Sequence, residues 1–405
     1  MRTRAASPLL LVLAAALAAC SEGSARAGAV AVRDSADVRI VESAAPAWRE
    51  GEGWTVSAEP LVDVGVADGD PAYQFGDVAS AVRLSDGRIV VADRQASHLR
   101  WFDAGGRHLL TAGRSGGGPG EFLGLARLFR LAGDSVGAWD LRSRRFSVFG
   151  PDGAFVRAQT LEPGGDVRLL QVDGVFEDGS LAAMPLAGLA RLQGPAGARD
   201  TVPILRFPAD GGAPETLGRF AGRQSVSVRG TENGGWMATG GVPFGLETFR
   251  AARGDQLYVA DSERFAVEVY GADGGLRRVI RAPREPEPLT PEEVQRYRDE
   301  QLANAGTGEE RNMSERLLEA TPFPRTKSAF ADMRVDGEGA VWLREHAIGS
   351  DGPGRWTVFD PEGALLGTVE TPAGLRVLEI GGDYLLGVWR DELDVEHVRL
   401  YRLDK

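Results

Sequence analysis

The chain contains an internal repeat, which constrains its fold more than any other feature of the sequence. In three gap-free copies an aspartate precedes an aromatic residue by nine positions, and a glycine-containing turn follows. Three weaker copies, around Phe207, Phe359 and Tyr401, keep the aromatic residue and an upstream Asp/Gly turn. The chain therefore contains six related units. The pairs in the clear copies are Asp93 and Phe102, Asp140 and Phe149, and Asp261 and Tyr270.

Each unit is expected to form four short strands. In the first unit, Arg88–Ala92, Leu99–Phe102 and Arg107–Thr111 are rich in residues that favour strands, and turn residues separate them. Four short strands in about 45 residues, without an intervening helix, are typical of a β-propeller blade. A solenoid is the competing architecture for repeats of this length.

The two ends of the repeat favour a closed ring over a solenoid. The last unit stops after its third strand at Lys405, whereas an orphan strand, Pro60–Gly65, precedes the first complete unit. We expect the orphan to be the outer strand of the last unit, because this swap ties the ring together and removes exposed edges. The alternating segment Asp37–Glu42 is expected to be an extra edge strand. The predicted fold class is all-β, a six-bladed β-propeller with four-stranded blades whose last blade is closed by the N-terminal strand.

Two connections between units are longer than the others by about 30 residues each. We expect insertions at about 215–250 and 289–325. Both follow a fourth strand, so they should leave the ring on the same side and crowd one loop-rich face. Such a face over a rigid scaffold commonly binds a ligand, although insertions can also simply cover an apolar blade edge.

The second insertion is expected to be helical and to precede blade five. Thr290 is a good N-cap, Pro291 suits the first helical position, and Glu293 completes a capping box. This helix should run to about Asn304, and a second short helix is expected around Ser314–Glu319.

The N-terminus has the pattern of a secretory signal, with basic residues, an apolar stretch and small residues before the only cysteine, Cys20. Its Leu-Ala-Ala-Cys ending resembles the bacterial lipobox, which implies lipidation of Cys20, and Ser21 after it implies the outer membrane. An ordinary signal peptide cut near Ala25–Ala27 is the alternative. Small residues over Ser21–Asp37 indicate a flexible tether. The expected divisions are a lipoprotein signal peptide at 1–19, a lipidated tether and edge segment at 20–53, and the propeller at 54–405.

Part of the repeat resembles a known family. Val91–Asp93 together with Leu99–Asp103 and Gly106 is similar to an NHL-type repeat, and residues 54–405 resemble the six-bladed NHL-like or TolB-like propeller lipoproteins of bacteria. The glycine-rich segment that contains Glu121 is similar to a loop of that group. The resemblance implies the fold and a place in the bacterial cell envelope. It does not choose between enzymes and binding platforms, because propellers include both.

Composition excludes several functions. A net charge of −12 argues against nucleic acid or anionic lipid as the main partner. A single cysteine cannot form an intramolecular disulfide, and the four histidines contain no pair at the spacing of zinc ligands.

Charged residues near the ends of the second strands are the candidate ligand-binding residues. The repeated aspartates could converge around the ring, either on a ligand or on a calcium ion as in gluconolactonase-like propellers. Alternatively, each aspartate caps the turn that follows it. The arginines after them could bind carboxylates bidentately, although the base composition of the source genome is a plainer cause of abundant arginine. A tryptophan in the first insertion could stack on a ligand or simply pack. The candidates are Asp93, Arg94, Asp140, Arg142, Asp261, Arg264, Glu121 and Trp236; four other tryptophans, Trp101, Trp139, Trp342 and Trp389, are expected in the core between blades.

These features predict a lipid-anchored, extracytoplasmic, monomeric propeller that binds a ligand or a partner protein on its loop-rich face. No catalysis, catalytic residue or cofactor is expected. A calcium-dependent gluconolactonase-like hydrolase or lyase is one alternative, and a scaffold subunit of an envelope complex is another.

Overall fold

The computed structural model describes residues 30–165, 167–186, 195–230, 236–347 and 352–405, and only the backbone of Trp236. The expected signal peptide and Cys20 lie outside these residues. Strands dominate the described chain, together with two α-helices and two 3-10 turns, Pro71–Tyr73 and Ala132–Asp134. No helix in this part of the chain has both the length and the apolar character needed to cross a membrane.

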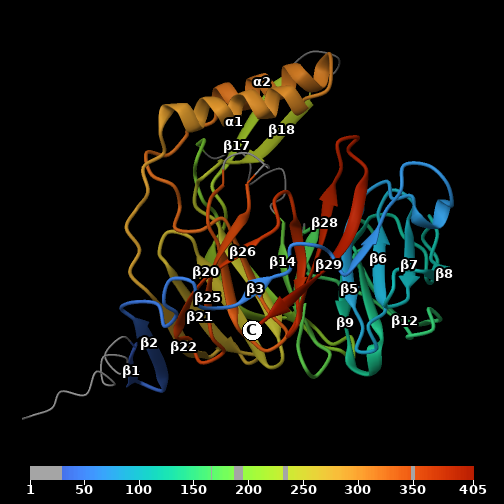
Figure 1. Ribbon diagram of the computed structural model, residues 1–405, viewed down its shortest axis with the longest axis horizontal. Coiled ribbons are helices and arrows are strands. Elements are labelled where there is room, and N and C mark those ends of the chain that lie inside the picture. Colours follow the sequence, from blue (N-terminus) through green and yellow to red (C-terminus); the bar gives the residue numbers. More distant parts are fainter. Residues whose placement is uncertain (1–29, 166, 187–194, 231–235, 348–351) are drawn as a thin grey trace, which may run out of the picture.

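The strands form successive antiparallel groups of four, as the repeat predicts (Figure 1). The first three groups are β5 (Val78–Arg83), β6 (Ile89–Asp93), β7 (His98–Phe102) and β8 (His108–Ala112); β9 (Leu125–Arg130), β10 (Val136–Asp140), β11 (Arg145–Phe149) and β12 (Phe155–Thr160); and β13 (Leu170–Val175), β14 (Leu181–Pro185), β15 (Thr201–Phe207) and β16 (Glu215–Ala221). The next three are β19 (Thr248–Arg253), β20 (Gln256–Asp261), β21 (Ala266–Gly271) and β22 (Leu276–Arg281); β23 (Asp332–Val335), β24 (Val341–Arg344), β25 (Gly354–Phe359) and β26 (Leu365–Thr371); and β27 (Arg376–Ile380), β28 (Tyr384–Arg390), β29 (Glu396–Asp404) and β4 (Val62–Val64).

The first strands of the groups contact one another in a closed order, from β5 through β9, β13, β19, β23 and β27 back to β5. One parallel bridge, Gly174 to Ala252, also joins β13 to β19. A closed circle of first strands, with three further strands stacked outward from each, is the arrangement of a β-propeller.

The repeated glycine of the turn between the third and fourth strands allows neighbouring groups to pack closely. Gly153 has φ +78°, and an added Cβ would lie 2.5 Å from Leu110 in the outer strand of the preceding group. Gly106 has φ +84° and would meet Val62 and Val64 in the same way, at 3.0 Å. Both positions therefore require glycine for backbone conformation and for space.

The two ends of the chain pair with each other. In β4, Val62 lies opposite Leu400 and Val64 opposite Val398 of β29, so the orphan strand lies beside the last strand as the repeat predicts. Asp63 accepts a hydrogen bond from Arg399 Nε at 2.9 Å, and its other oxygen lies 2.7 Å from His397 Nδ1. A short strand, β3 (Thr55–Val56), pairs with the end of β29.

The C-terminal residue connects the last group to its neighbour. Lys405 Nζ forms ion pairs with Asp336 at 2.9 Å and Glu338 at 2.6 Å, and it lies 4.4 Å from the centroid of the Trp54 ring. Asp336 is buried and also accepts the backbone N–H groups of Glu338 and Ala340. The chain end thus neutralises a buried carboxylate on another sheet.

The N-terminal segment adds two strands to one group. β2 (Val38–Ser43) pairs in parallel with β22, as the expected extra edge strand, and β1 (Val30–Ser35) pairs antiparallel with β2. The expectation of a flexible tether over Ser21–Asp37 is therefore wrong for Val30–Ser35, because backbone pairing outweighs the tether-like composition there.

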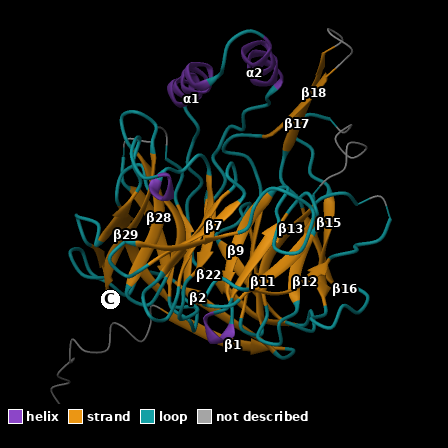
Figure 2. Ribbon diagram, turned by 90° about the vertical axis from the view of Figure 1, so that its right-hand side faces the viewer, coloured by secondary structure: helices purple, strands orange, loops and turns teal. Residues whose placement is uncertain are grey.

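The insertions project from the face opposite β1 (Figure 2). The first contains the hairpin of β17 (Ser225–Gly230) and β18 (Trp236–Gly241), and it begins only after β16, which occupies 215–221. The second contains α1 (Pro291–Asn304), whose predicted capping box is present, and α2 (Glu309–Ala320), which is longer than predicted. Helix α2 contacts both strands of the hairpin, so the two insertions pack together.

The tryptophans predicted in the core are buried in three of four cases. Trp101, Trp139 and Trp342 are fully buried. Trp389 is half-buried instead, and the guanidinium of Arg399 covers its ring at 3.5 Å from the centroid.

Two nearby valines test the closure of the ring. Val64 is 2% exposed and belongs to the core between the last and first groups, whereas Val66 is 37% exposed. We expect Val64→Ala to lower the free energy of unfolding by about 2 kcal/mol, measured by urea unfolding with tryptophan fluorescence. Val66→Ala should change it by less than about 0.5 kcal/mol. An equal loss of unfolding free energy in both variants would contradict the inference that β4 closes the ring.

Candidate functional site

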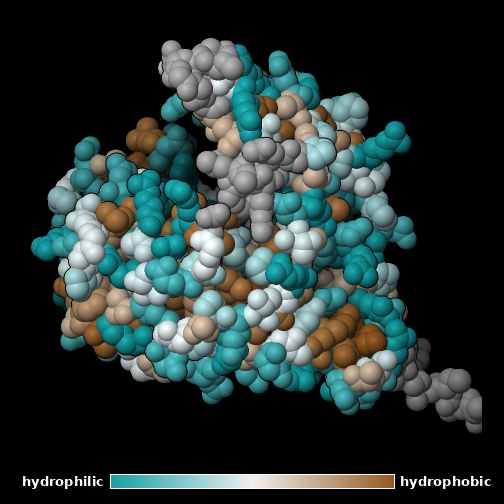
Figure 3. Space-filling model, turned by 180° about the vertical axis from the view of Figure 1, so that it is seen from behind, coloured by the Kyte–Doolittle hydropathy of each residue, from teal (hydrophilic) through white to brown (hydrophobic). Residues whose placement is uncertain are grey.

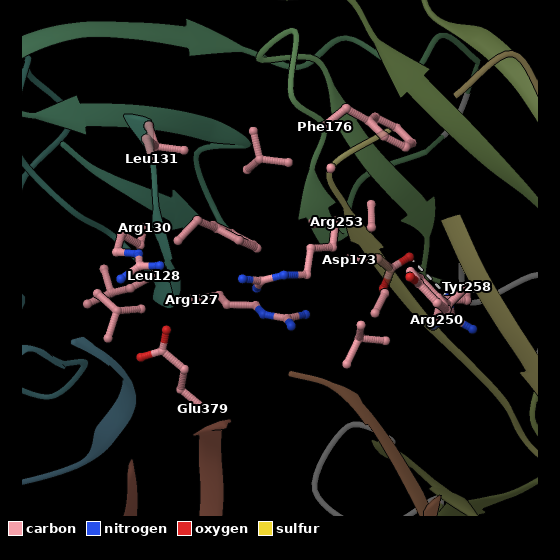
Figure 4. A pocket seen from close by; sticks show the side chains of 18 of the residues that line it. Arg127, Leu128, Arg130, Leu131, Asp173, Phe176, Arg250, Arg253, Tyr258 and Glu379 are labelled. Carbon is pink, nitrogen blue, oxygen red and sulfur yellow. Dashed lines mark hydrogen bonds and ion pairs between the residues drawn. The ribbon is translucent and has the colours of Figure 1, made fainter. Parts of the chain in front are cut away.

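A cavity of about 1180 Å³ lies at the centre of the ring (Figure 4). Residues from all six first strands, β5, β9, β13, β19, β23 and β27, form its wall. A space of this size accommodates a small organic ligand. The cavity is therefore the place where side chains from the whole ring can meet one molecule.

β-Bulges in the first strands affect which side chains reach this cavity. Register shifts leave Asp173 of β13 and Leu378 of β27 as extra residues without a partner on the next strand, and β5 and β9 contain similar shifts. A bulge interrupts the alternation of side chains and turns its neighbours to a new direction. Asp173 and Glu379, which follows Leu378, both line the cavity (Figure 4).

Two ion pairs lie in the cavity wall. Arg250 Nε is 3.0 Å from Asp173 Oδ2, and these side chains are 7% and 0% exposed. Gln171 donates to the other oxygen of Asp173 at 3.0 Å. Arg334 Nη1 lies 3.0 Å from Asp332. Buried charges are tolerated when they are paired and hydrogen-bonded, so these four residues form a fixed, neutral part of the wall.

Four further arginines line the cavity without a carboxylate partner among the described residues: the exposed Arg157 and three arginines of the first strands. Arg127 donates to Val172 O at 3.2 Å, Arg253 to Gly337 O at 2.8 Å, and Arg130 makes only a long contact of 3.5 Å to a backbone carbonyl. None of them forms an ion pair with any described residue. Burial lowers the pKa of Arg127, and the like charge of Arg334 lowers it further.

A glutamate faces these arginines. Glu379 projects into the cavity from β27 near Arg130 (Figure 4) and accepts the backbone N–H of Arg83 at 2.7 Å. Burial raises the pKa of Glu379 against the opposing effects of that hydrogen bond and of Arg130. Burial also raises the pKa of Glu247, which lines the cavity just before β19.

The repeated aspartates lie at equivalent strand ends, outside the central cavity, and two of them, Asp93 and Asp140, mainly accept backbone N–H groups. Asp93 is buried, accepts the backbone N–H groups of Gly76 and Ala96, and pairs with Arg100 at 3.2 Å. Asp140 is buried and accepts three backbone N–H groups, from Leu123, Gly124 and Ser143. Burial opposes ionisation of Asp140, yet these donors hold its pKa below the usual range. Both carboxylates therefore have the contacts of the turn-capping interpretation.

The third aspartate is used differently. Asp261 forms a bidentate ion pair with Arg199, at 3.2 and 2.9 Å, and accepts the backbone N–H of Glu263. Arg199 comes from the connection between β14 and β15, so Asp261 links two groups of strands.

The remaining predicted candidates lie apart from one another. Arg94 pairs with Asp77 at 2.9 Å, and Glu121 pairs with Arg114 and accepts Gly118 N–H. Arg142 and Arg264 are exposed. Among the described residues, no side-chain hydrogen bond or ion pair joins any two of the predicted candidates, and only the backbone N–H of Arg264 bonds to the carbonyl of Asp261, at 3.2 Å, within one turn. The side chain of Trp236 lies outside the described residues, and its role as a ligand contact remains a prediction.

The described residues offer no fit for a bound calcium ion. No three His, Cys, Asp or Glu side chains among them come close enough to hold a metal ion. The aspartates proposed as calcium ligands already accept backbone N–H groups or an arginine, and a cation would have to displace these donors.

A serine–histidine pair lies near the second insertion but does not form a catalytic site. Ser328 Oγ is 2.8 Å from His346 Nε2, and burial lowers the pKa of His346 to about 4. Ser328 is 8% exposed, it is outside the central cavity, and among described residues no carboxylate hydrogen-bonds His346. The pair instead connects the chain after α2 to the end of β24.

Sequence reasoning missed the arginines of the first strands. Arg127 and Arg130 stand three residues apart in β9, and Arg250 and Arg253 repeat the spacing in β19. This repeated pair, placed shortly before an Asp/Gly turn, was the available signal. The aligned aspartates after the second strands form the more regular pattern, and the prediction therefore fell on the residues beside them.

Replacement of Glu379 tests its burial. The pKa of Glu379 in the folded state lies above its value in the unfolded state. The folded protein therefore loses stability as the pH rises from the unfolded-state pKa to the folded-state pKa. Glu379→Gln keeps an acceptor for Arg83 N–H but cannot ionise. We expect the variant to be more stable than the parent protein at pH 7 by about 1 kcal/mol, and equally stable below about pH 4. Urea unfolding at both pH values measures this, with the exposed Glu177→Gln as control. Lower stability of Glu379→Gln at pH 7 would show that the ionised carboxylate stabilises the fold.

Comparison with known proteins supports the fold. No family model matches the chain, and no curated protein matches it. A member of the DUF4221 family from Bacteroides vulgatus superposes with a TM-score of 0.53 at 8% identity, over 87% of this chain and 99% of that one. Virginiamycin B lyase from Staphylococcus aureus has a TM-score of 0.41 at 11% identity, over 87% and 100% of the two chains. A gluconolactonase from Xanthomonas campestris has a TM-score of 0.39 at 15% identity, over 85% and 99%. Of these three, only the DUF4221 protein superposes with a TM-score above 0.5, and at 8% identity that likeness concerns the fold alone.

Proposed function

We propose that this protein is a lipid-anchored, extracytoplasmic propeller of six blades that binds a small ligand in its central cavity without changing it chemically. The blades are the six groups that begin with β5, β9, β13, β19, β23 and β27. The observation that supports the proposal most directly is the central cavity, whose charged side chains come from several blades.

The contacts in the wall favour binding over catalysis. Asp173 and Asp332 are each held by an arginine, so neither is free to act as a base or a metal ligand. The described residues contain no metal-binding cluster, and the Ser328–His346 pair is outside the cavity. A calcium-dependent hydrolase or lyase would need donors that these aspartates do not supply.

The rigidity of the wall also suits a binding site. Each cavity arginine belongs to a strand that pairs within its own sheet, and backbone carbonyls or aspartates hold the guanidinium groups in place. A site whose side chains are ordered before binding loses less entropy when the ligand arrives. We infer that the ligand binds in the cavity rather than on the loop-rich face expected from the sequence.

The position of β1 suggests how the protein is oriented on a membrane. The described chain starts at Val30 on the side opposite α1 and α2 (Figure 2). Nine residues lie between Cys20 and Val30, and the ten steps from one to the other can span at most ~36 Å. A lipid on Cys20 would hold the β1 side near the bilayer and direct the insertions away from it.

Gln171 provides a test of binding in the cavity. It lines the cavity on β13 but is exposed, so Gln171→Trp should place an indole ring in the open space. We expect at least one compound from a panel of sugars, amino acids, polyamines and organic acids to raise the melting temperature of the full-length protein. The shift should disappear in Gln171→Trp and persist in Gln295→Trp on α1. A shift that persists in Gln171→Trp but disappears in Gln295→Trp would place the ligand site on the insertions. If no compound raises the melting temperature, ligand binding is refuted.

Turnover of a lactone, if it is lost when a chelator is added, would refute the proposal that the protein does not change its ligand chemically.

The lipid anchor has a separate test. Cys20→Ser removes the thiol that would be acylated, and we expect the variant to leave the membrane fraction and appear as a soluble periplasmic protein. Ser21→Ala, which keeps the thiol, should remain with membranes. If Cys20→Ser still sediments with membranes, another element holds the protein there.

A further inference from the structure

Resting on the proposed function, we infer that the ligand carries an oxyanion, a carboxylate or a phosphate, which binds between Arg127 of β9 and Arg253 of β19. Both side chains come from different blades and point into the middle of the cavity (Figure 4). The geometry is that of two guanidinium groups presented to one central space.

Ion pairing in the cavity wall divides the arginines into two groups: those paired with an aspartate, and those that can still bind a ligand. Arg250 and Arg334 are neutralised by Asp173 and Asp332, whereas Arg127 and Arg253 each use one Nη donor on a backbone carbonyl. A guanidinium has five N–H donors and prefers planar, bidentate acceptors such as carboxylate and phosphate. Most of the donors of both side chains therefore remain available for an oxyanion.

The charge balance among the first-strand residues that line the cavity is positive. Five arginines, Arg127, Arg130, Arg250, Arg253 and Arg334, stand against three carboxylates, Asp173, Asp332 and Glu379, which leaves two positive charges in excess even when Glu379 is ionised. In a wall of low dielectric this excess attracts an anion more strongly than the same charges would in water.

Over the whole lining carboxylates outnumber arginines by eight to six, but the five acidic groups outside the first strands lie toward the two ends of the cavity. Glu177, Asp178, Asp255 and Glu338 lie in the turns after the first strands and are exposed, so solvent and salt screen them. Asp178 and Glu338 are also paired, with Arg206 and Lys405. Glu247 lies toward the opposite end, just before β19, where burial disfavours its charged form.

The arginines mark one end of the cavity. Arg130 and Arg253 are the last residues of β9 and β19, whereas the insertions precede the first residues of first strands. The oxyanion would therefore bind toward the end away from the insertions, with Arg130 as a third positive charge. The remaining volume toward the insertions is available for the rest of the ligand.

Calorimetric titration of the full-length protein tests this inference. The probes are inorganic phosphate and succinate, with erythritol and putrescine as neutral and cationic comparators. We expect phosphate or succinate to bind in preference to both comparators. Arg127→Gln and Arg253→Gln should each weaken that binding about tenfold or more, the change expected from losing a charge-assisted hydrogen bond. Arg107→Gln, an exposed arginine in the turn before β8, should leave it within about twofold.

The outcomes distinguish this inference from the function on which it rests. Preference for phosphate or for succinate identifies the oxyanion, because the two are titrated separately. Because the surroundings of Arg127 already disfavour its charge, Arg127→Gln should not lower the melting temperature without ligand; a large drop would assign Arg127 a structural role and overturn its role in binding. Binding of erythritol or putrescine but of neither anion, lost in Gln171→Trp, would overturn the oxyanion and keep the cavity as the site. Absence of binding by every probe here and in the earlier panel would overturn both.

Discussion

The pairing of β4 with β29 is the constraint on which the rest of the structure depends. It joins residues more than 330 positions apart, Asp63 with His397 and Arg399, and it supplies the outer strand of the last sheet from the beginning of the chain. Without it that sheet would have an unpaired edge, and the first and last groups would no longer be held against each other. The central cavity exists only because the first strands meet all the way around, so its shape depends on this closure.

Close packing between neighbouring sheets sets the dimensions of that cavity. Turn glycines such as Gly106 and Gly153 admit side chains of the adjacent outer strand where a Cβ would collide. Large aromatic residues, among them Trp101 and Trp139, fill the space between sheets without exposure to solvent. A densely packed scaffold resists deformation, which allows Arg127 and Arg253 to keep fixed positions although no carboxylate among the described residues pairs with them.

The repeat predicted the order of strands and, through the missing fourth strand of the last unit, the exceptional role of the N-terminal strand. The capping residues Thr290, Pro291 and Glu293 predicted the start of α1. Asp93, Asp140 and Asp261 were correctly placed at equivalent strand ends, but their spacing could not show what their oxygens contact. The structure shows backbone N–H groups around Asp93 and Asp140 and the side chain of Arg199 beside Asp261. Every clear copy of the repeat contains the same turn, so an aspartate that recurs in every copy is explained by that turn. A ligand-binding residue, in contrast, does not need to recur from copy to copy.

Local residue patterns were enough to predict the propeller repeat and the helical insertion, since strand propensity, turn glycines and capping residues act over a few positions, and the incomplete last unit predicted the closure by the N-terminal strand. Which charged residues share the central cavity depends on the tertiary structure. Bulges at Asp173 and Leu378 change the direction of side chains that simple alternation would assign, and the partners of Arg250 and Arg334 are known only once the strands are in register. A bulge depends on pairing with a neighbouring strand, so residue order alone does not reveal which arginines remain without a carboxylate and face the cavity.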